Sequence, residues 1–180
     1  MMMPLKHLLL FSCLLGSLAC TPKLTLQSYF VDHQDRTDFT YMDIPISVLN
    51  TENISLSKDQ SEAMDSIETL NMILYNLEGG TSETFESEVL TIKKILKAEG
   101  YSELMRMGNN LKVKFQISYV EEASKIDELI IFGYSSSSGF MLARVLGDNI
   151  KLSKVVSLAE VIDQLEIENT NVNDFMKFFL

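Results

Sequence analysis

The chain has 180 residues, 46% of them hydrophobic, and a formal net charge of −10 from 15 Lys and Arg against 25 Asp and Glu. A surface of this sign repels nucleic acid and anionic headgroups, which are bound through clusters of Lys and Arg, so nucleic acid is excluded as a partner. Without its first twenty residues the chain keeps about 160, enough for one domain with a single core and no disulfide.

The first twenty residues have the pattern of a secretory signal peptide. Lys6 and His7 precede an apolar run from Leu8 to Leu15, and small residues follow up to Cys20. The run is shorter than the roughly 20 residues of a helix that spans a bilayer. We therefore predict a signal peptide over residues 1–19 and no permanent membrane span there.

The segment Ser17-Leu18-Ala19-Cys20 resembles the lipobox of bacterial lipoproteins, in which the cysteine takes a diacylglycerol before the signal is cut. Ala19 matches the small residue before the cysteine, whereas Ser17 stands where that family usually has Leu. Cys13 is a rival site, but it leaves too short an apolar segment ahead of it. We predict lipid on Cys20, which would leave no second cysteine to form a disulfide and would hold the protein on a membrane, facing the periplasm or the cell exterior.

Residues 20–37 are predicted to be the lipidated cysteine and a tether with a short helix. Asp32, His33, Asp35 and Asp38 lie in or just after this segment and are of the types that bind divalent ions. Their spacing lacks the calcium-loop pattern and its turn glycine, and the mature chain has no second histidine. A solvated acidic turn is the favoured interpretation, and no metal site is predicted.

A single α+β domain is predicted over residues 38–166. Residues 39–44 are rich in β-formers and are followed by Pro45, which predicts a strand near a sheet edge. A helix is predicted to start at Ser57, where Gln60 completes a capping box, and to end at Gly79-Gly80. Its apolar residues recur at helical spacing, at Ala63, Ile67, Leu70, Leu74 and Leu77.

A second helix is predicted from Thr81 to Gly100, with glutamates in its first turn and lysines in its last. Its apolar stripe comprises Phe85, Val89, Ile92 and Leu96. The two helices would form a hairpin joined by the glycine turn. Gly79-Gly80-Thr81 could also be a phosphate cradle at a helix start, but the P-loop's spacing and lysine are missing, and ordinary helix punctuation is favoured.

From Tyr101 onward the hydrophobic period becomes alternating, which predicts a meander of antiparallel strands. Four strands are expected, at 103–107, 111–119, 128–134 and 140–146, with a turn at 108–110 and a serine-rich hairpin loop at 135–139. A last helix is predicted from near Ser153, with Val155, Leu158, Ala159, Ile162 and Leu165 on one side.

The predicted architecture has two layers. A mostly antiparallel sheet of four to five strands would carry the helical hairpin and the C-terminal helix on one face. Residues 167–180 are predicted to be a tail whose end, residues 175–180, is apolar. This end could dock on the domain, touch the membrane or bind a partner.

Catalytic residues are not evident. Gly133-Tyr134-Ser135-Ser136-Ser137 is close to a hydrolase elbow, but its fifth position is not glycine and it lies between two predicted antiparallel strands. The usual base for a serine is histidine, and the mature chain offers His33 alone. Glu121 and Glu122 are adjacent carboxylates that nothing places in a cleft. We predict no enzyme and no cofactor.

Several strings resemble an uncharacterised lipoprotein family of the Bacteroidota, domain of unknown function 4252. They are Tyr101-Ser102-Glu103-Leu104-Met105, Ile126-Asp127-Glu128-Leu129-Ile130, and Phe140-Met141-Leu142 leading through Gly147-Asp148 into Ile150-Lys151-Leu152. The resemblance runs from about Tyr29 to Leu165. It implies the fold and a cell-envelope address, and it brings neither an activity nor binding residues.

We therefore expect a lipid-anchored cell-envelope protein that acts as a non-catalytic protein-interaction module. Its expected partners are a membrane, through lipid on Cys20, and a protein. One alternative is a lipid-tethered hydrolase that uses the serine loop and His33. Another is a carrier of an apolar ligand between helices and sheet, which a sizeable apolar cavity would indicate.

Overall fold

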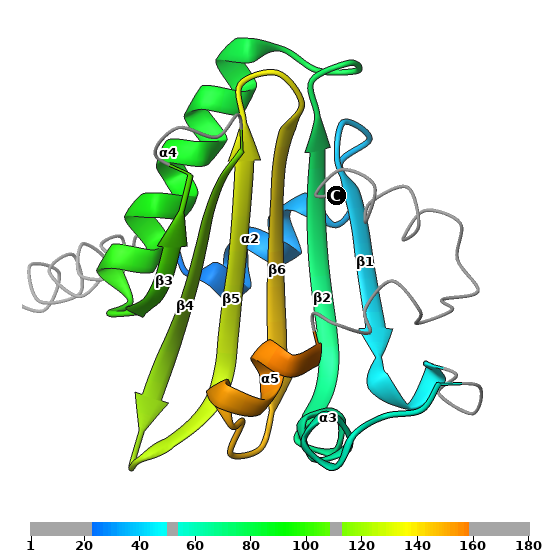
Figure 1. Cartoon of the computed structure of the whole chain (residues 1–180). Coiled ribbons are helices and arrows are strands. Elements are labelled where there is room, and N and C mark those ends of the chain that lie inside the picture. The colour runs from blue at the N-terminus through cyan, green and yellow to red at the C-terminus, as the bar shows by residue number, and fades with distance from the viewer. Residues whose placement is uncertain (1–22, 50–53, 109–112, 159–180) are drawn as a thin grey trace, which may run out of the picture.

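The computed structural model describes residues 23–49, 54–108 and 113–158. Six strands form one antiparallel sheet in the order β1-β2-β6-β5-β4-β3 (Figure 1). The strands are β1 (Thr40–Pro45), β2 (Ile67–Asn76), β3 (Ser102–Met107), β4 (Lys114–Glu122), β5 (Lys125–Ser135) and β6 (Gly139–Gly147). The α+β class is as predicted, and the sheet has six strands where four to five were expected.

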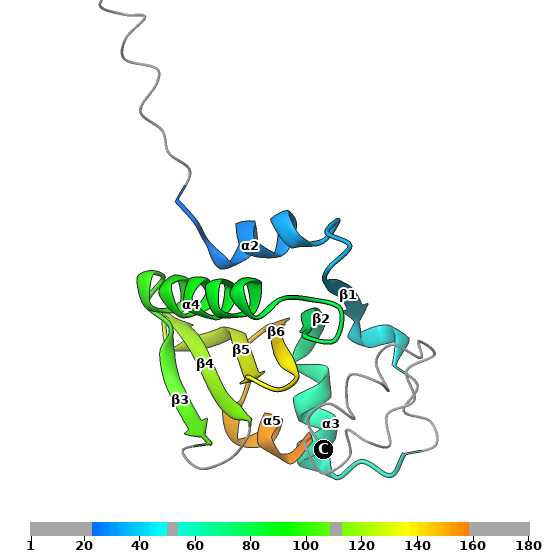
Figure 2. The same cartoon turned by 90° about the horizontal axis from the view of Figure 1, so that it is seen from above.

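Helices cover both faces of the sheet (Figure 2). One face carries α2 (Leu26–His33) and α4 (Ser82–Ala98), and the other carries α3 (Lys58–Asp65) and α5 (Leu152–Leu158), while the short 3₁₀ helix η2 (Ile46–Val48) follows β1. Side chains of alternate residues of β5 point to opposite faces of the sheet. Ile130 and Phe132 therefore pack with α2 and α4, whereas Leu129 and Ile131 pack with α5.

The prediction that the C-terminal helix shares a face with the other helices is wrong. Strands β5 and β6 are apolar on both sides, as in Leu129 to Phe132 and Phe140 to Ala143. A sheet with two apolar faces needs a cover on each of them. The α5 helix covers part of the second face. A two-layer architecture with all helices on one side would have left this apolar face exposed to solvent.

The predicted helical hairpin is also wrong, because its first helix is short. The α3 helix ends at Asp65 after its capping box of Ser57 and Gln60, and the chain continues as strand β2. This strand lies between β1 and β6 and buries Met72 on one face and Ile73 and Tyr75 on the other. A strand that is buried on both faces is apolar at nearly every position. Such a run also contains apolar residues at helical spacing, so the pattern by itself does not distinguish a strand from a helix.

The other predicted elements are confirmed where the structure describes them. The α4 helix begins after its cap Thr81 and buries the predicted stripe, and β3 to β6 form the predicted meander. The strand before Pro45 is β1, at one edge of the sheet. The α2 helix is the short helix expected in the tether, and it lies within the main core through Leu26, Tyr29 and Phe30, so the folded part includes it.

Some predictions concern residues that the structure does not describe. These are the signal peptide, Cys20, the continuation of the last helix through Ala159, Ile162 and Leu165, and the tail 167–180. Over the described ranges no helix is both long enough and apolar enough to cross a bilayer.

Candidate functional site

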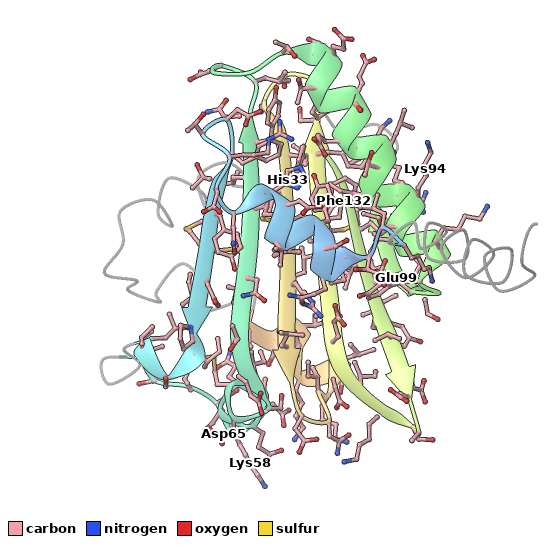
Figure 3. The ribbon with its side chains drawn as sticks, turned by 180° about the vertical axis from the view of Figure 1, so that it is seen from behind. His33, Lys58, Asp65, Lys94, Glu99 and Phe132 are labelled. Carbon is pink, nitrogen blue, oxygen red and sulfur yellow. The ribbon has the colours of Figure 1, made fainter. Side chains whose placement is uncertain are left out.

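His33 is the last residue of α2, where Figure 3 labels it, and its side chain is buried against α4. Its Nδ1 lies 2.7 Å from the carbonyl oxygen of Tyr29, which can only accept, so Nδ1 donates. Its Nε2 lies 3.3 Å from Oε1 of Glu88 on α4. The ring also stacks on Tyr29, with the centroids 4.0 Å apart. Nη1 of Arg36 also lies 3.3 Å from Nε2. With Nδ1 donating, a neutral ring accepts at Nε2 from Arg36, and only a doubly protonated ring donates to Glu88.

Glu88 collects donors from α2 and the turn after it. The Tyr29 hydroxyl donates to Oε2 at 2.9 Å, and the Arg36 guanidinium donates to Oε1 at 3.1 Å. Burial by itself raises the pKa of the Glu88 carboxyl, but hydrogen bonds from His33 and Tyr29 and the nearby positive charges outweigh it, and the pKa lies below its ordinary value. Burial, and then the charge of Glu88, raise the pKa of the Tyr29 hydroxyl far above its ordinary range.

The acidic residues around His33 are not brought together as metal ligands. Asp32 and Asp35 are exposed, and Asp38 accepts two hydrogen bonds from Arg36, at 3.1 and 2.6 Å. This pairing is the main reason that the pKa of the Asp38 carboxyl is lowered. Over the described ranges, no three His, Cys, Asp or Glu side chains are grouped so that they could hold a metal ion.

Ser135 lies at the end of β5, and its hydroxyl is engaged within its own loop. The hydroxyl lies 2.9 Å from that of Ser137 and accepts a hydrogen bond from the Ser137 amide at 3.3 Å. The loop joins β5 to β6, with Ser135 paired to Gly139, so the predicted hairpin loop is confirmed. The ring nitrogens of His33 face Tyr29, Glu88 and Arg36, and the structure gives Ser135 no hydrogen bond to that ring.

A second charged network, which the sequence did not indicate, links α2 to the sheet. Arg144 of β6 donates to Oε1 of Glu128 on β5 at 2.6 Å, and the Tyr101 hydroxyl donates to the same oxygen at 2.7 Å. Arg144 also donates to Gln27 at the start of α2. Burial, together with the hydrogen bond to Glu128, raises the pKa of the Tyr101 hydroxyl far above its ordinary range.

One signal in the sequence could have revealed this network. Arg144 is the one charge on the otherwise apolar strand β6, and Glu128 directly precedes the apolar run of β5; each shares a face with buried residues of its own strand. A charge at such a position usually has a partner of opposite sign. In the described part of the chain every buried side-chain nitrogen and oxygen has a hydrogen-bond partner. The Glu88 network ties α2 to α4, and the Arg144–Glu128 network ties α2 to the sheet.

An open groove of about 370 Å³ runs between the first half of α4 and the adjoining ends of β4 and β5. Phe85 and Val89 form an apolar floor on the α4 side, and Leu90 stands at the rim with 57% of its surface exposed. The sheet side is formed by Lys114, Tyr134 and Ser135. Ser135 and Ser136 of the predicted serine loop line the groove, and it is open to solvent rather than enclosed between helices and sheet.

Two lysines lie over the ring of Tyr134 at the groove. Lys93 Nζ is 4.3 Å and Lys114 Nζ is 5.8 Å from the ring centroid, and the ring itself stacks on Phe132 at 5.0 Å. Cations over an aromatic face are held in place while their outer side stays open to an anion. Glu86 also lines the groove on the α4 side. The groove thus combines an apolar floor, Lys93 and Lys114 over an aromatic ring, and one acidic side chain, so an apolar side chain fits the floor and a carboxylate fits the side of the two lysines.

The remaining candidates have structural roles. At Gly79-Gly80-Thr81 the Thr81 amide donates to the Tyr75 hydroxyl at 2.6 Å, and this hydroxyl donates to the Thr81 carbonyl oxygen at 3.0 Å, so the turn before α4 is fixed to β2. Glu121 and Glu122 are exposed at the end of β4.

No curated protein and no solved structure matches the chain. A family model described as Domain of unknown function (DUF4252) matches residues 30–158. The match begins within α2, covers the whole sheet and ends with α5. It contains the groove and most of both charged networks, but Gln27 and Tyr29 lie just before it. The chain therefore belongs to this family of unknown function.

Proposed function

We propose that this protein is a lipid-anchored module of the cell envelope that binds a protein segment in the groove beside α4. Lipid on Cys20 would hold it to a membrane, and the folded part would act by binding rather than by catalysis. The anchor is supported by the signal-peptide pattern and by the small residues before Cys20. The binding role is supported by the groove and by the fully engaged side chains of His33 and Ser135.

The exposed side chain of Leu90 is the main observation in favour of the binding role. It lies beside an apolar floor, and neighbouring cations are held by Tyr134. Interfaces are typically centred on apolar and aromatic residues with a polar rim, and a few residues supply most of the binding energy. A partner segment would cover Leu90 and the floor with an apolar side chain and place a carboxylate near Lys93 and Lys114.

Crosslinking in whole cells tests the groove directly. Wild-type protein, a Leu90→Asp variant and a control, Val48→Asp, would be compared at equal expression. Val48 is 63% exposed on η2, away from α4, and the substitution makes the same chemical change there. We expect Leu90→Asp to reduce the captured partner at least tenfold, while Val48→Asp leaves it unchanged. Equal capture by both variants would contradict a binding role for the groove.

The anchor is tested by mass and fractionation. The wild-type protein should start at Cys20, carry an acyl mass and travel with membranes, because two or more acyl chains make attachment durable. The Cys20→Ala precursor should lack the acyl mass. Wild-type protein without acyl mass, or a Cys20→Ala form that stays in the membrane fraction, would contradict the anchor.

A further inference from the structure

Among the described residues, some Lys and Arg side chains have a carboxylate partner and the others have none. Arg36, Lys58, Arg106, Lys125, Arg144 and Lys154 each lie within 4 Å of a carboxylate. Lys23, Lys94 and Lys97 are exposed and have no such partner among the residues that the structure describes. Of the other unpaired lysines, Lys93 and Lys114 lie over Tyr134 and Lys151 donates to Asn149.

The three remaining lysines lie at one end of the α2–α4 layer. Lys94 and Lys97 are three residues apart on α4 and therefore share a face of the helix. Figure 3 shows Lys94 projecting outward from α4, on the side away from α2. The amide of Leu26 donates to Oε2 of Glu99 at 2.7 Å, so the start of α2, with Lys23 just before it, is fixed beside the end of α4.

The acidic residues of the two helices lie toward the opposite end. Glu83, Glu86 and Glu88 occupy the first half of α4, and Asp32 is near the end of α2. The two helices run antiparallel, since Leu26 meets Glu99 and His33 meets Glu88. The layer is therefore basic at the end where the tether leaves the domain and acidic at the other end.

An exposed apolar residue accompanies the lysines. Leu24, next to Lys23 and before the start of α2, has 46% of its surface exposed. Basic and apolar side chains that share one exposed surface are the combination found in segments that lie on membranes.

We infer that the surface formed by Lys23, Leu24, Lys94 and Lys97, the tether-side surface, lies against an anionic lipid bilayer. The inference rests on the proposed lipid on Cys20. Only residues 21–25 separate that cysteine from α2, and a chain of this length reaches at most about 20 Å. The lipid thus keeps the tether-side surface within reach of the headgroups.

The acidic charge of the whole protein does not oppose this arrangement. The precursor has a charge of −10 and Lys6 is the only charge in residues 1–19, so the mature chain has −10 − 1 = −11. At physiological ionic strength charges are screened beyond about 8 Å, so headgroups respond to the nearest side chains. A lysine close to an anionic surface strengthens binding roughly fivefold.

Amine labelling of the lipidated protein in vesicles tests the orientation. The protein, purified from membranes, would be reconstituted into vesicles of phosphatidylcholine alone or with about a third phosphatidylglycerol, and each lysine's labelling rate would be followed by mass spectrometry. We expect the rates of Lys94 and Lys97 to fall at least threefold in the anionic vesicles. Lys58 on α3 and Lys151 before α5 should keep their rates, and high salt should remove the protection.

Charge reversal provides a matched pair of variants. Lys94→Glu/Lys97→Glu should abolish the difference between the two kinds of vesicle at Lys23, whereas Lys58→Glu/Lys151→Glu changes the net charge equally and should leave that difference intact. Equal rates in both vesicles, or equal protection of Lys58 and Lys94, would overturn the inference while the acyl mass still supports the anchor. If the protein has no acyl mass, the anchor fails and the inference fails with it.

Discussion

At the scale of single residues, Glu88 joins the two helices that cover one face of the sheet. Its carboxylate receives hydrogen bonds from Tyr29 and Arg36 and lies 3.3 Å from Nε2 of His33. The side chain is only 14% exposed, so solvent screens these interactions weakly. Hydrogen bonds to a charged group contribute more than those between neutral groups, typically about 1.5–3 kcal/mol.

We expect Glu88→Gln to lower the free energy of unfolding by about 1–2 kcal/mol at pH 7, because the amide keeps the shape but loses the charge that its donors favour. Urea unfolding measures the difference. Glu86→Gln is the control, since Glu86 is exposed on the same helix. A Glu88→Gln effect no larger than that of the control would mean that the network adds nothing to stability.

The Glu88→Gln substitution also leads to a prediction about how the free energy of unfolding depends on pH. The pKa of Glu88 is lowered in the folded protein, so the folded state takes up a proton less readily than the unfolded state. Its contribution is therefore fully present above the ordinary value of 4.5 and is lost as the pH falls through the folded-state pKa. The gap in unfolding free energy between wild type and Glu88→Gln should be constant above about pH 6 and close progressively below pH 4.5. A gap that widens on acidification would contradict this assignment.

At the scale of elements, the sequence predicted an element correctly where its hydrophobic residues recurred with a single period. The α4 helix has an apolar stripe at helical spacing and caps at both ends, and β4 alternates, so each was identified correctly. The β2 strand carries apolar residues for both faces, and this pattern also fits a helix. Its β-branched and aromatic residues Ile67, Thr69, Ile73 and Tyr75 were the signal for a strand.

The candidate site was less predictable, because it is formed by residues far apart in the chain. Phe85 was predicted as core and Ser135 as a loop residue, but their meeting at one groove depends on α4 lying across the ends of β4 and β5. Leu90 is adjacent in sequence to buried Val89, and its exposure beside a groove follows only from the packing of that helix.

The turn between β4 and β5 leads to a prediction about this element. Glu122 pairs with Lys125, which leaves Ala123 and Ser124 as a two-residue turn, and both have positive φ, 51° and 63°. Such turns favour Asn-Gly because other residues are strained at positive φ. We expect Ala123→Asn/Ser124→Gly to raise the free energy of unfolding by about 1–2 kcal/mol, measured by urea titration. Ser136→Gly, at a loop position without positive φ, should instead be neutral or destabilising, and stabilisation by both variants would refute the strain argument.

At the scale of the whole molecule, the two proposed surfaces lie toward opposite ends of α4. The groove uses Phe85, Val89 and Leu90 in the first half, and the tether-side surface uses Lys94 and Lys97 in the second. A helix of 17 residues is about 25 Å long. Leu90 and Lys94 are about one turn, or about 6 Å, apart along the helix, whereas Phe85 lies about 18 Å from Lys97. Contact with the membrane at the Lys97 end would therefore leave the Phe85 end of the groove open to a protein partner.

Lengthening the tether tests the membrane contact and the groove independently of each other. Inserting about twelve Gly and Ser residues between Pro22 and Lys23 keeps the proposed lipid on Cys20 but frees the domain from the headgroups. The effective concentration of a tethered group falls with roughly the −3/2 power of linker length, so bilayer protection of Lys94 and Lys97 should weaken roughly sixfold. Amine labelling in anionic vesicles measures this, and capture through the groove should not change, because the groove needs no membrane contact. Protection that survives the insertion would show that the short tether does not set the orientation, and a loss of capture would show that the partner is reached only close to the bilayer.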